Sequence, residues 1–111
     1  MFKQPKVSVL LAIYNTPLEL VKRAINSVLR QNMSDFELII IDDGSDQIFQ
    51  YELVNFTALF PSIITYIYHP NCGQAESINR GTTKSSGQFI TIIDADDEFK
   101  INHLSSCLEH M

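Results

Sequence analysis

The sequence FITIIDADD, residues 89–97, joins five aromatic or β-branched residues to three carboxylates. Its apolar part predicts a buried strand over 89–93, because these residue types favour strands and Gly87 comes just before them. Asp94, Asp96 and Asp97 then stand where the strand leaves the sheet. Carboxylates this dense repel one another unless a cation lies between them, and their oxygens suit Mg²⁺ or Mn²⁺ with substrate phosphates. This stretch therefore predicts a metal site at the end of a strand, with a capping turn as the alternative.

A second stretch, FELIIIDDGSD at residues 36–46, repeats this arrangement. An apolar run again ends in carboxylates, here Asp42 and Asp43. Taken alone, Asp-Asp-Gly-Ser also suits a turn or the start of a helix. Two strands that both end in acids favour a site for a metal-bound, phosphate-bearing ligand.

The apolar periodicity alternates between strand and helix along the whole chain. Strands are predicted over 7–13, 36–41, 63–68 and 89–93, and helices over 17–29, from 45 or 46 to Pro61, over 74–83 and from 101 onwards. Thr16 and Glu19 form a predicted capping box, with Pro17 at the first helical position. This alternation predicts an α/β fold with a mainly parallel sheet, strand order 3-2-1-4 and helices on both faces. Residues 1–111 are expected to form a single domain.

In an open parallel sheet, ligands bind beyond the carboxyl ends of the strands, where the strand order reverses. That edge would bring residues 12–15 together with Asp42, Asp43 and residues 94–97. No glycine-rich phosphate loop follows the first strand. A phosphate would be repelled by these acids without a divalent cation between them. The expected ligand is therefore a nucleoside diphosphate together with a metal ion.

Composition excludes several other classes of protein. The chain has 111 residues, a net charge of −5 and a hydrophobic fraction of 45%, which argues against disorder and against a basic nucleic-acid surface. Cys72 and Cys107 have neither disulfide nor zinc spacing, so we expect free thiols in a reducing compartment. The three histidines at 69, 103 and 110 are expected in structural or solvated positions. No apolar stretch reaches the roughly 20 residues that span a bilayer.

Five sequence motifs, in their order and spacing, identify a family resemblance. They are Val7-Ser8-Val9 with Tyr14-Asn15, residues 27–31 (SVLRQ), residues 36–45, residues 71–73 with 79–81, and Gly87 with residues 94–97. Together they make the chain, from about residue 6 to residue 108, resemble the nucleotide-binding half of family 2 glycosyltransferases with the GT-A fold. A lone DxD motif would be weak evidence, whereas five motifs in this order are strong evidence.

The resemblance implies roles for particular residues. Ala12, Ile13 and Tyr14 would line the nucleoside pocket, and Asp43 would hydrogen-bond the uracil, with Asp42 beside it. Asp94 would contact the ribose or the metal shell, Asp96 would coordinate the metal and Asp97 would support it. Gly73, Gln74 and Asn79 would flank the nucleotide or sugar, with Gly73 leaving room for the ligand. Arg80 is the nearest cation in the sequence to the expected diphosphate.

The resemblance also implies an activity, a cofactor and a setting. The activity is transfer of a sugar from a nucleoside diphosphate donor, UDP-sugar by resemblance, to a saccharide or lipid-linked acceptor, with Mn²⁺ or Mg²⁺. The acceptor site and the catalytic base are expected beyond this half-domain, so the chain alone should bind nucleotide weakly and transfer sugar poorly or not at all. The expected setting is bacterial polysaccharide or lipopolysaccharide assembly in the cytoplasm, peripheral to the inner membrane face.

Two other functions share parts of this pattern. A phosphoacceptor receiver domain has a similar size and a Mg²⁺ site, but it needs an acid pair after the first strand, where Tyr14-Asn15 stands here. A non-catalytic module could instead pair with another chain, including a second copy, along the exposed edge of strand 89–93.

Overall fold

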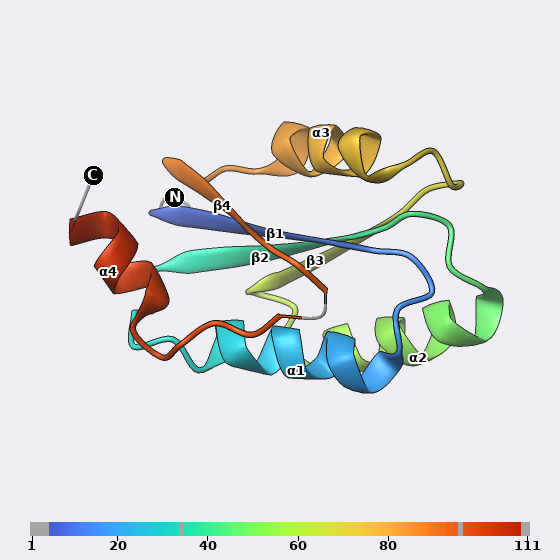
Figure 1. Cartoon of the computed structure of the whole chain (residues 1–111), viewed down its shortest axis with the longest axis horizontal. Helices are drawn as coiled ribbons and strands as arrows, with labels where there is room; N and C mark the ends of the chain where they lie inside the picture. Colours follow the sequence, from blue (N-terminus) through green and yellow to red (C-terminus); the bar gives the residue numbers. More distant parts are fainter. Residues whose placement is uncertain (1–4, 34, 96, 110–111) are drawn as a thin grey trace.

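A four-stranded parallel sheet forms the centre of the computed structural model, which describes residues 5–33, 35–95 and 97–109 (Figure 1). The elements run in the order β1 (Val7–Ile13), α1 (Leu18–Leu29), β2 (Phe36–Asp42), α2 (Gln47–Thr57), β3 (Ile64–Tyr68), α3 (Gln74–Lys84), β4 (Phe89–Ile93) and α4 (His103–Glu109). The strand order is β3-β2-β1-β4, with all three pairs parallel. The predicted α/β class, parallel sheet and 3-2-1-4 order are confirmed.

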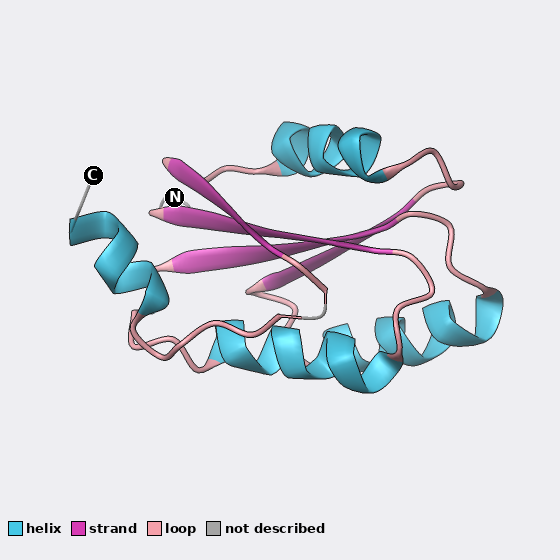
Figure 2. Ribbon diagram, viewed as in Figure 1, coloured by secondary structure: helices cyan, strands magenta, loops and turns pink. Residues whose placement is uncertain are grey.

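Helices cover both faces of the sheet, as Figure 2 shows. α1 and α2 pack on one face, where the larger core includes Leu11, Leu38, Ile25 and Leu53. α3 packs on the other face through Ile78. Each large apolar side chain buried in this way stabilises the fold by about 1.5–3 kcal/mol. α1 contributes Val21, Ile25 and Val28 to this core, and all three are fully buried.

The strand register places the carboxyl ends of the strands at one edge of the sheet. Ile13 of β1 pairs with Asp42 of β2, which in turn pairs with Tyr68 of β3. On the other side of β1, Leu11 pairs with Ile93 of β4. The residues that follow these strands therefore leave the sheet side by side.

Two predicted helix signals are wrong. α1 begins at Leu18 with Pro17 as its N-cap, and no side chain caps it, so Thr16 and Glu19 do not form a capping box. The chain enters α1 in an extended conformation at Pro17, whose carbonyl accepts from Leu20 and Val21. α2 begins as predicted, with the Asp46 side chain accepting from Phe49 N, but it ends at Thr57 rather than at Pro61. There the chain tightens into a turn, because Leu59 and Phe60 each donate to a carbonyl three residues back.

The prediction that β4 is a buried strand is also wrong. β4 is an edge strand, and Ile90 and Ile92 are 42% and 48% exposed. Ile92 pairs with Leu10, so both side chains point to the α3 face, yet α3 packs over β1 and β2. Only Ile93 is buried within β4. Pairing of this edge with a second copy stays a prediction.

In the part of the chain that the structure describes, no helix has both the length and the apolar character needed to cross a bilayer. The longest, α1, has 12 residues, whereas a spanning helix needs about 20.

Candidate functional site

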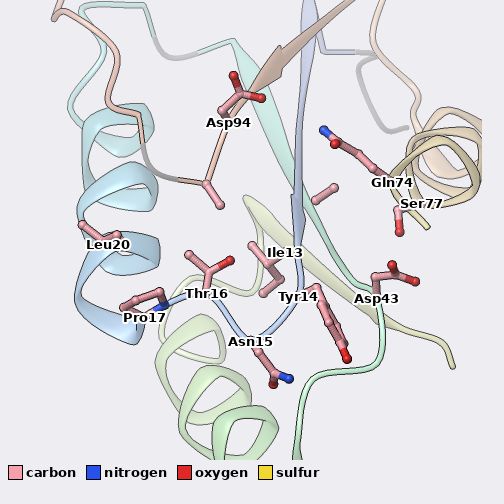
Figure 3. A pocket seen from close by; sticks show the side chains of 12 residues that line it. Ile13, Tyr14, Asn15, Thr16, Pro17, Leu20, Asp43, Gln74, Ser77 and Asp94 are labelled. Atoms are coloured by element: carbon pink, nitrogen blue, oxygen red, sulfur yellow. The ribbon is translucent and has the colours of Figure 1, made fainter. Parts of the chain in front are cut away.

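A pocket of about 550 Å³ opens at the carboxyl edge of the sheet (Figure 3). This volume lies within the range of about 300–1,000 Å³ that is typical of small-molecule sites. Its lining comes from the ends of β1, β2 and β4 and from the starts of α1 and α3: Ala12, Ile13, Tyr14, Asn15, Thr16, Pro17, Leu20, Asp43, Gln74, Ser77, Asp94 and Ala95. The strand ends that the sequence predicted to meet therefore do meet here.

The turn after β1 presents Tyr14 to this pocket. Asn15 has a positive φ of 48°, and two hydrogen bonds to the loop after β2 hold it there. Its backbone N–H donates to Ser45 Oγ at 2.9 Å, and its Oδ1 accepts from Asp46 N at 3.0 Å. Tyr14, which is 52% exposed, lines the pocket.

Asp42, the last residue of β2, does not line the pocket. Its side chain is fully buried. One carboxylate oxygen accepts from Ser45 N at 2.9 Å, and the other accepts from the Tyr66 hydroxyl. Burial and this hydrogen bond together raise the pKa of Tyr66 well above its ordinary value. Asp42 thus fixes the turn after β2 and joins it to β3.

Asp43 lines the pocket and also organises the turn between β3 and α3. Its Oδ1 accepts from Cys72 N at 2.8 Å, and its Oδ2 accepts from Gly73 N at 3.0 Å and from Asn71 Nδ2 at 3.1 Å. Gly73 adopts a φ of 101°, a conformation that favours glycine, so the backbone itself requires glycine there. A Cβ on Gly73 would meet no protein atom within 4 Å.

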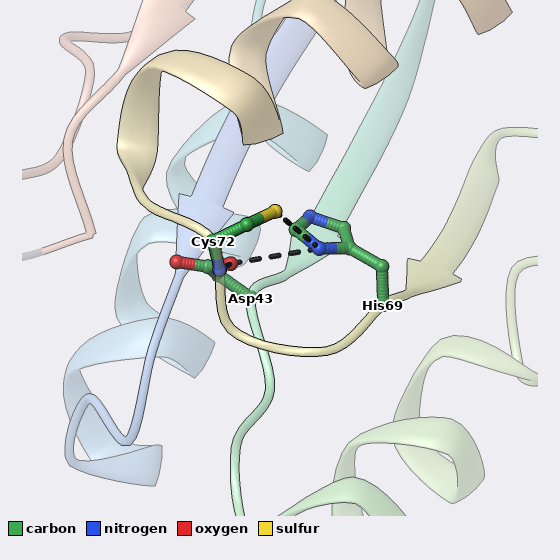
Figure 4. A group of neighbouring side chains, drawn as sticks. All are labelled: Asp43, His69 and Cys72. Atoms are coloured by element: carbon green, nitrogen blue, oxygen red, sulfur yellow. Dashed lines mark hydrogen bonds and ion pairs between the residues drawn. The ribbon is translucent and has the colours of Figure 1, made fainter.

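Asp43, His69 and Cys72 form a side-chain cluster at this turn (Figure 4). His69 is buried, and its Nδ1 lies 3.3 Å from Cys72 Sγ and 3.5 Å from Asp43 Oδ1. The prediction that the cysteines are free thiols is confirmed, but His69 and Cys72 were not expected to act together. The spacing His-x-x-Cys at 69–72 is the sequence signal that could have indicated it.

The described acids just after β4, Asp94 and Asp97, are exposed, in contrast to Asp42 and Asp43. Asp94 lines the pocket, and Asp97 N donates to Asp94 O at 3.0 Å, which turns the chain back at this point. Among the described residues, neither the Asp94 nor the Asp97 carboxylate has a hydrogen-bond or ion-pair partner. Asp96, the predicted metal ligand, lies outside the described residues.

The segment after this acidic turn is held by α1. Ser27 Oγ accepts from Phe99 N at 2.9 Å. Gln31 Nε2 donates to the Lys100 carbonyl at 2.6 Å, and Gln31 Oε1 accepts from Leu104 N at 2.9 Å. Both side chains are buried. The motif at 27–31 thus positions the chain that leaves the acidic turn.

Some predicted site residues are not part of the pocket lining. Gly73 and Asn79 do not line it, although their neighbours Gln74 and Ser77 do. Arg80, the nearest cation in the sequence, pairs instead with Glu76 Oε1 at 3.3 Å. Thr16, Leu20 and Ser77 were not predicted as lining residues, because their placement depends on how the helices are packed.

A model of the glycosyl transferase family 2 matches residues 8–111. The chain belongs to this family. A putative colanic acid biosynthesis glycosyl transferase, WcaA of Escherichia coli (strain K12), is 40% identical over 114 residues, covering 99% of this chain and 39% of that protein. The chain spans between 15% and 39% of the length of the curated relatives it matches.

Solved structures support the fold. The mannosyltransferase PcManGT from Pyrobaculum calidifontis, in complex with GDP-Man and Mn²⁺, matches with a TM-score of 0.85 at 19% identity, over 96% of this chain and 32% of that one. S. aureus TarS 1–349 in complex with UDP-GlcNAc matches with a TM-score of 0.81 at 23% identity, over 94% of this chain and 30% of that one. The expected GT-A fold is confirmed.

Proposed function

We propose that residues 1–111 form the donor-binding domain of a glycosyltransferase, which binds a nucleoside diphosphate sugar, preferentially a UDP-sugar, with Mg²⁺ or Mn²⁺. The observation that carries this proposal is the convergence of Tyr14, Asp43 and Asp94, from three strand ends, on one pocket. The apolar and aromatic wall suits a nucleoside, and the buried acceptor suits its base. The exposed carboxylates suit a metal-bound diphosphate.

The nucleoside would lie against β1. Ala12, Ile13 and Tyr14 supply the wall, and Asp43 supplies the hydrogen-bond acceptor for the N–H of uracil. The carboxylate oxygens of Asp43 have about four acceptor positions, and the turn after β3 occupies three of them. The remaining position, on Oδ1, would accept from the base. In this proposal Asp42 acts indirectly, by holding the turn, and Gly73, Gln74 and Asn79 flank the ligand.

The diphosphate would depend on a metal ion. The exposed carboxylates of Asp94 and Asp97, together with Asp96, are the hard oxygen ligands that Mg²⁺ and Mn²⁺ prefer. The Arg80 guanidinium is paired with Glu76 and does not line the pocket. A divalent cation bound here would supply Lewis acidity to the departing diphosphate.

In the transfer reaction, an acceptor hydroxyl attacks the anomeric carbon while the bond from that carbon to the diphosphate oxygen breaks. A base must take the hydroxyl proton within hydrogen-bond reach. Asp94, Asp96 and Asp97 would be committed to the metal, so we expect this chain alone to bind the donor and to transfer sugar poorly. Relatives named for colanic acid and succinoglycan biosynthesis favour polysaccharide assembly, with a saccharide or lipid-linked acceptor. The cytoplasmic face of the membrane, as the place of this assembly, is part of the proposal.

Calorimetric titration of UDP, with and without Mn²⁺, tests this proposal. We expect binding that weakens at least tenfold, about 1.4 kcal/mol, without the metal. Asp43→Asn should weaken binding in both conditions, whereas Asp94→Ala and Asp96→Ala should remove only the metal dependence. GDP and dTDP as alternative ligands test the choice of base.

The matched control is Asp35→Asn, which removes an acid just before β2, at the opposite edge of the sheet. It should bind UDP like the unchanged protein. A folded protein that binds none of the three nucleotides with Mn²⁺ present would overturn the proposal.

A further inference from the structure

We propose that Asp43, His69 and Cys72 form a second metal site, which takes a thiophilic divalent cation of the zinc type. This site is distinct from the oxygen-ligand site proposed at Asp94–Asp97. A second part, which rests on the proposed function, is that this cation competes with the nucleotide, because both need Asp43.

Two of the three distances between the ligand atoms match a tetrahedral cation. In zinc sites the metal lies about 2.3 Å from sulfur and about 2.0–2.1 Å from nitrogen or oxygen, which puts neighbouring ligand atoms roughly 3.3–3.6 Å apart. Here Cys72 Sγ lies 3.3 Å from His69 Nδ1, and His69 Nδ1 lies 3.5 Å from Asp43 Oδ1. All three atoms lie within 4.8 Å of one another. The side chains would need little movement to bind the ion.

The chemistry of the ligand set selects the class of cation. A thiolate, an imidazole and a carboxylate suit zinc and its neighbours in the transition series, whereas Mg²⁺ prefers oxygen ligands alone. Cys72 would lose its thiol proton to solvent on binding. Water would complete the coordination, since Cys72 is exposed and gives the ion a route in.

Surrounding groups already orient two of the ligands. His69 Nε2 lies 3.1 Å from Ser77 Oγ, so a proton on Nε2 can be donated there while Nδ1 keeps its lone pair for the metal. Such a partner on the second ring nitrogen is a usual feature of metal-binding histidines. Asp43 is fixed by Cys72 N, Gly73 N and Asn71 Nδ2, which leave one position on Oδ1 unused.

The alternative is a metal-free turn held by hydrogen bonds. His69 Nδ1 also lies 2.8 Å from the Pro70 carbonyl. A proton on Nδ1 would be donated to that oxygen, and the nitrogen would have no lone pair for a cation. The two forms differ in metal affinity, so a direct metal titration separates them.

Titration of the reduced protein with Co²⁺, in excess Mg²⁺ to fill oxygen-ligand sites, tests the metal site. We expect a thiolate-to-cobalt charge-transfer band in the near ultraviolet that Zn²⁺ removes by displacement. Cys72→Ser should abolish this band, and His69→Gln should weaken Co²⁺ binding at least tenfold. Circular dichroism would show that both variants remain folded.

Cys107→Ser is the matched control. Cys107 is the other free cysteine, and its Sγ lies 3.7 Å from His103 Nε2. The band should persist in this variant. No band in the unchanged protein, or a band that survives Cys72→Ser, would overturn the metal site.

Competition is measured by titrating UDP, with Mg²⁺ in excess, into protein with and without one equivalent of Zn²⁺. We expect at least tenfold weaker UDP binding with Zn²⁺, and no effect of Zn²⁺ in Cys72→Ser. Unchanged UDP affinity in the zinc-loaded protein would overturn the competition. Failure of the zinc-free protein to bind UDP with Mg²⁺ present would instead refute the proposed function, and the cobalt spectrum would still decide the metal site.

Discussion

Asp42 and Asp43, at the carboxyl end of β2, are buried and hydrogen-bonded, whereas the described acids Asp94 and Asp97, which follow β4, are exposed. Asp42 and Asp43 together accept from one tyrosine hydroxyl, one asparagine side chain and three backbone N–H groups. The carboxylates of Asp94 and Asp97 accept from none of the described residues. Asp42 and Asp43 therefore hold the loops around them, whereas the carboxylates of Asp94 and Asp97 remain available for a ligand.

This difference follows from the place of each strand in the sheet. β2 lies between β1 and β3, so the loop that follows it is surrounded by other loops that need acceptors. β4 is an edge strand, so the turn after it has a neighbour on one side only. That turn is held from outside, because Ser27 and Gln31 of the α1 region bind the chain just beyond it. Similar acids thus support the fold in one place and face solvent in the other.

The largest expected effect comes from breaking the buried cluster. Asp42→Ala would leave the buried Ser45 N and the half-buried Tyr66 hydroxyl without their acceptor. We expect a loss of about 3 kcal/mol in the free energy of unfolding, since unpaired buried groups and lost bonds to a charged acceptor both contribute. Urea denaturation followed by circular dichroism measures it.

Asp97→Ala is the matched change in the exposed cluster. It should alter stability by less than about 0.5 kcal/mol, as is usual for surface substitutions. The double variant Asp42→Ala/Tyr66→Phe should lose less free energy of unfolding than the two single variants lose together, because the unpaired hydroxyl is gone. Equal losses from Asp42→Ala and Asp97→Ala would refute the distinction between the clusters.

A smaller effect is expected when the segment that follows the acids after β4 loses its hydrogen bonds to Gln31. Gln31→Leu keeps the approximate size of the side chain but removes its bonds to the Lys100 carbonyl and Leu104 N. We expect a loss of about 2 kcal/mol and faster amide hydrogen exchange over residues 97–109. In the turn after β2, amide exchange should become faster only by the amount that the loss in global stability explains.

Gln88→Leu serves as the control, because the Gln88 side chain is exposed and accepts only a 3.4 Å bond from Lys6 among the described residues. It should leave exchange over residues 97–109 unchanged. Uniformly faster exchange in Gln31→Leu, with no local excess after β4, would show that Gln31 stabilises the whole fold rather than this segment.

The sequence predicted the sheet because strand and helix periods alternate so clearly. It also predicted that Tyr14, Asp43 and Asp94 would meet, since parallel strands end at a common edge. It could not separate Asp42 from Asp43: adjacent residues on a strand point to opposite sides, and only the packed loops show which side is the pocket. The exposure of Ile90 and Ile92 was missed for a similar reason, because an apolar run looks the same in an edge strand and in a central strand.

The smallest expected effect concerns the pH dependence of the buried cluster. Burial and the hydrogen bond to Asp42 raise the pKa of Tyr66 above its ordinary value of 10.0. Above that pH the unfolded chain loses the Tyr66 proton while the folded chain keeps it, so the unfolded state binds fewer protons and stability falls as pH rises. The stabilisation is complete below about pH 10 and is lost progressively above it.

Tyr66→Phe removes this contribution. Its urea midpoint should therefore fall less steeply than that of the unchanged protein between about pH 9 and pH 11. Tyr51→Phe, which alters a tyrosine that is 70% exposed, should retain the full slope. If Tyr66→Phe and Tyr51→Phe respond alike, Tyr66 is not held against Asp42. The acid at the end of β2 would then have lost one of its two partners, and its contrast with the exposed acids after β4 would be correspondingly weaker.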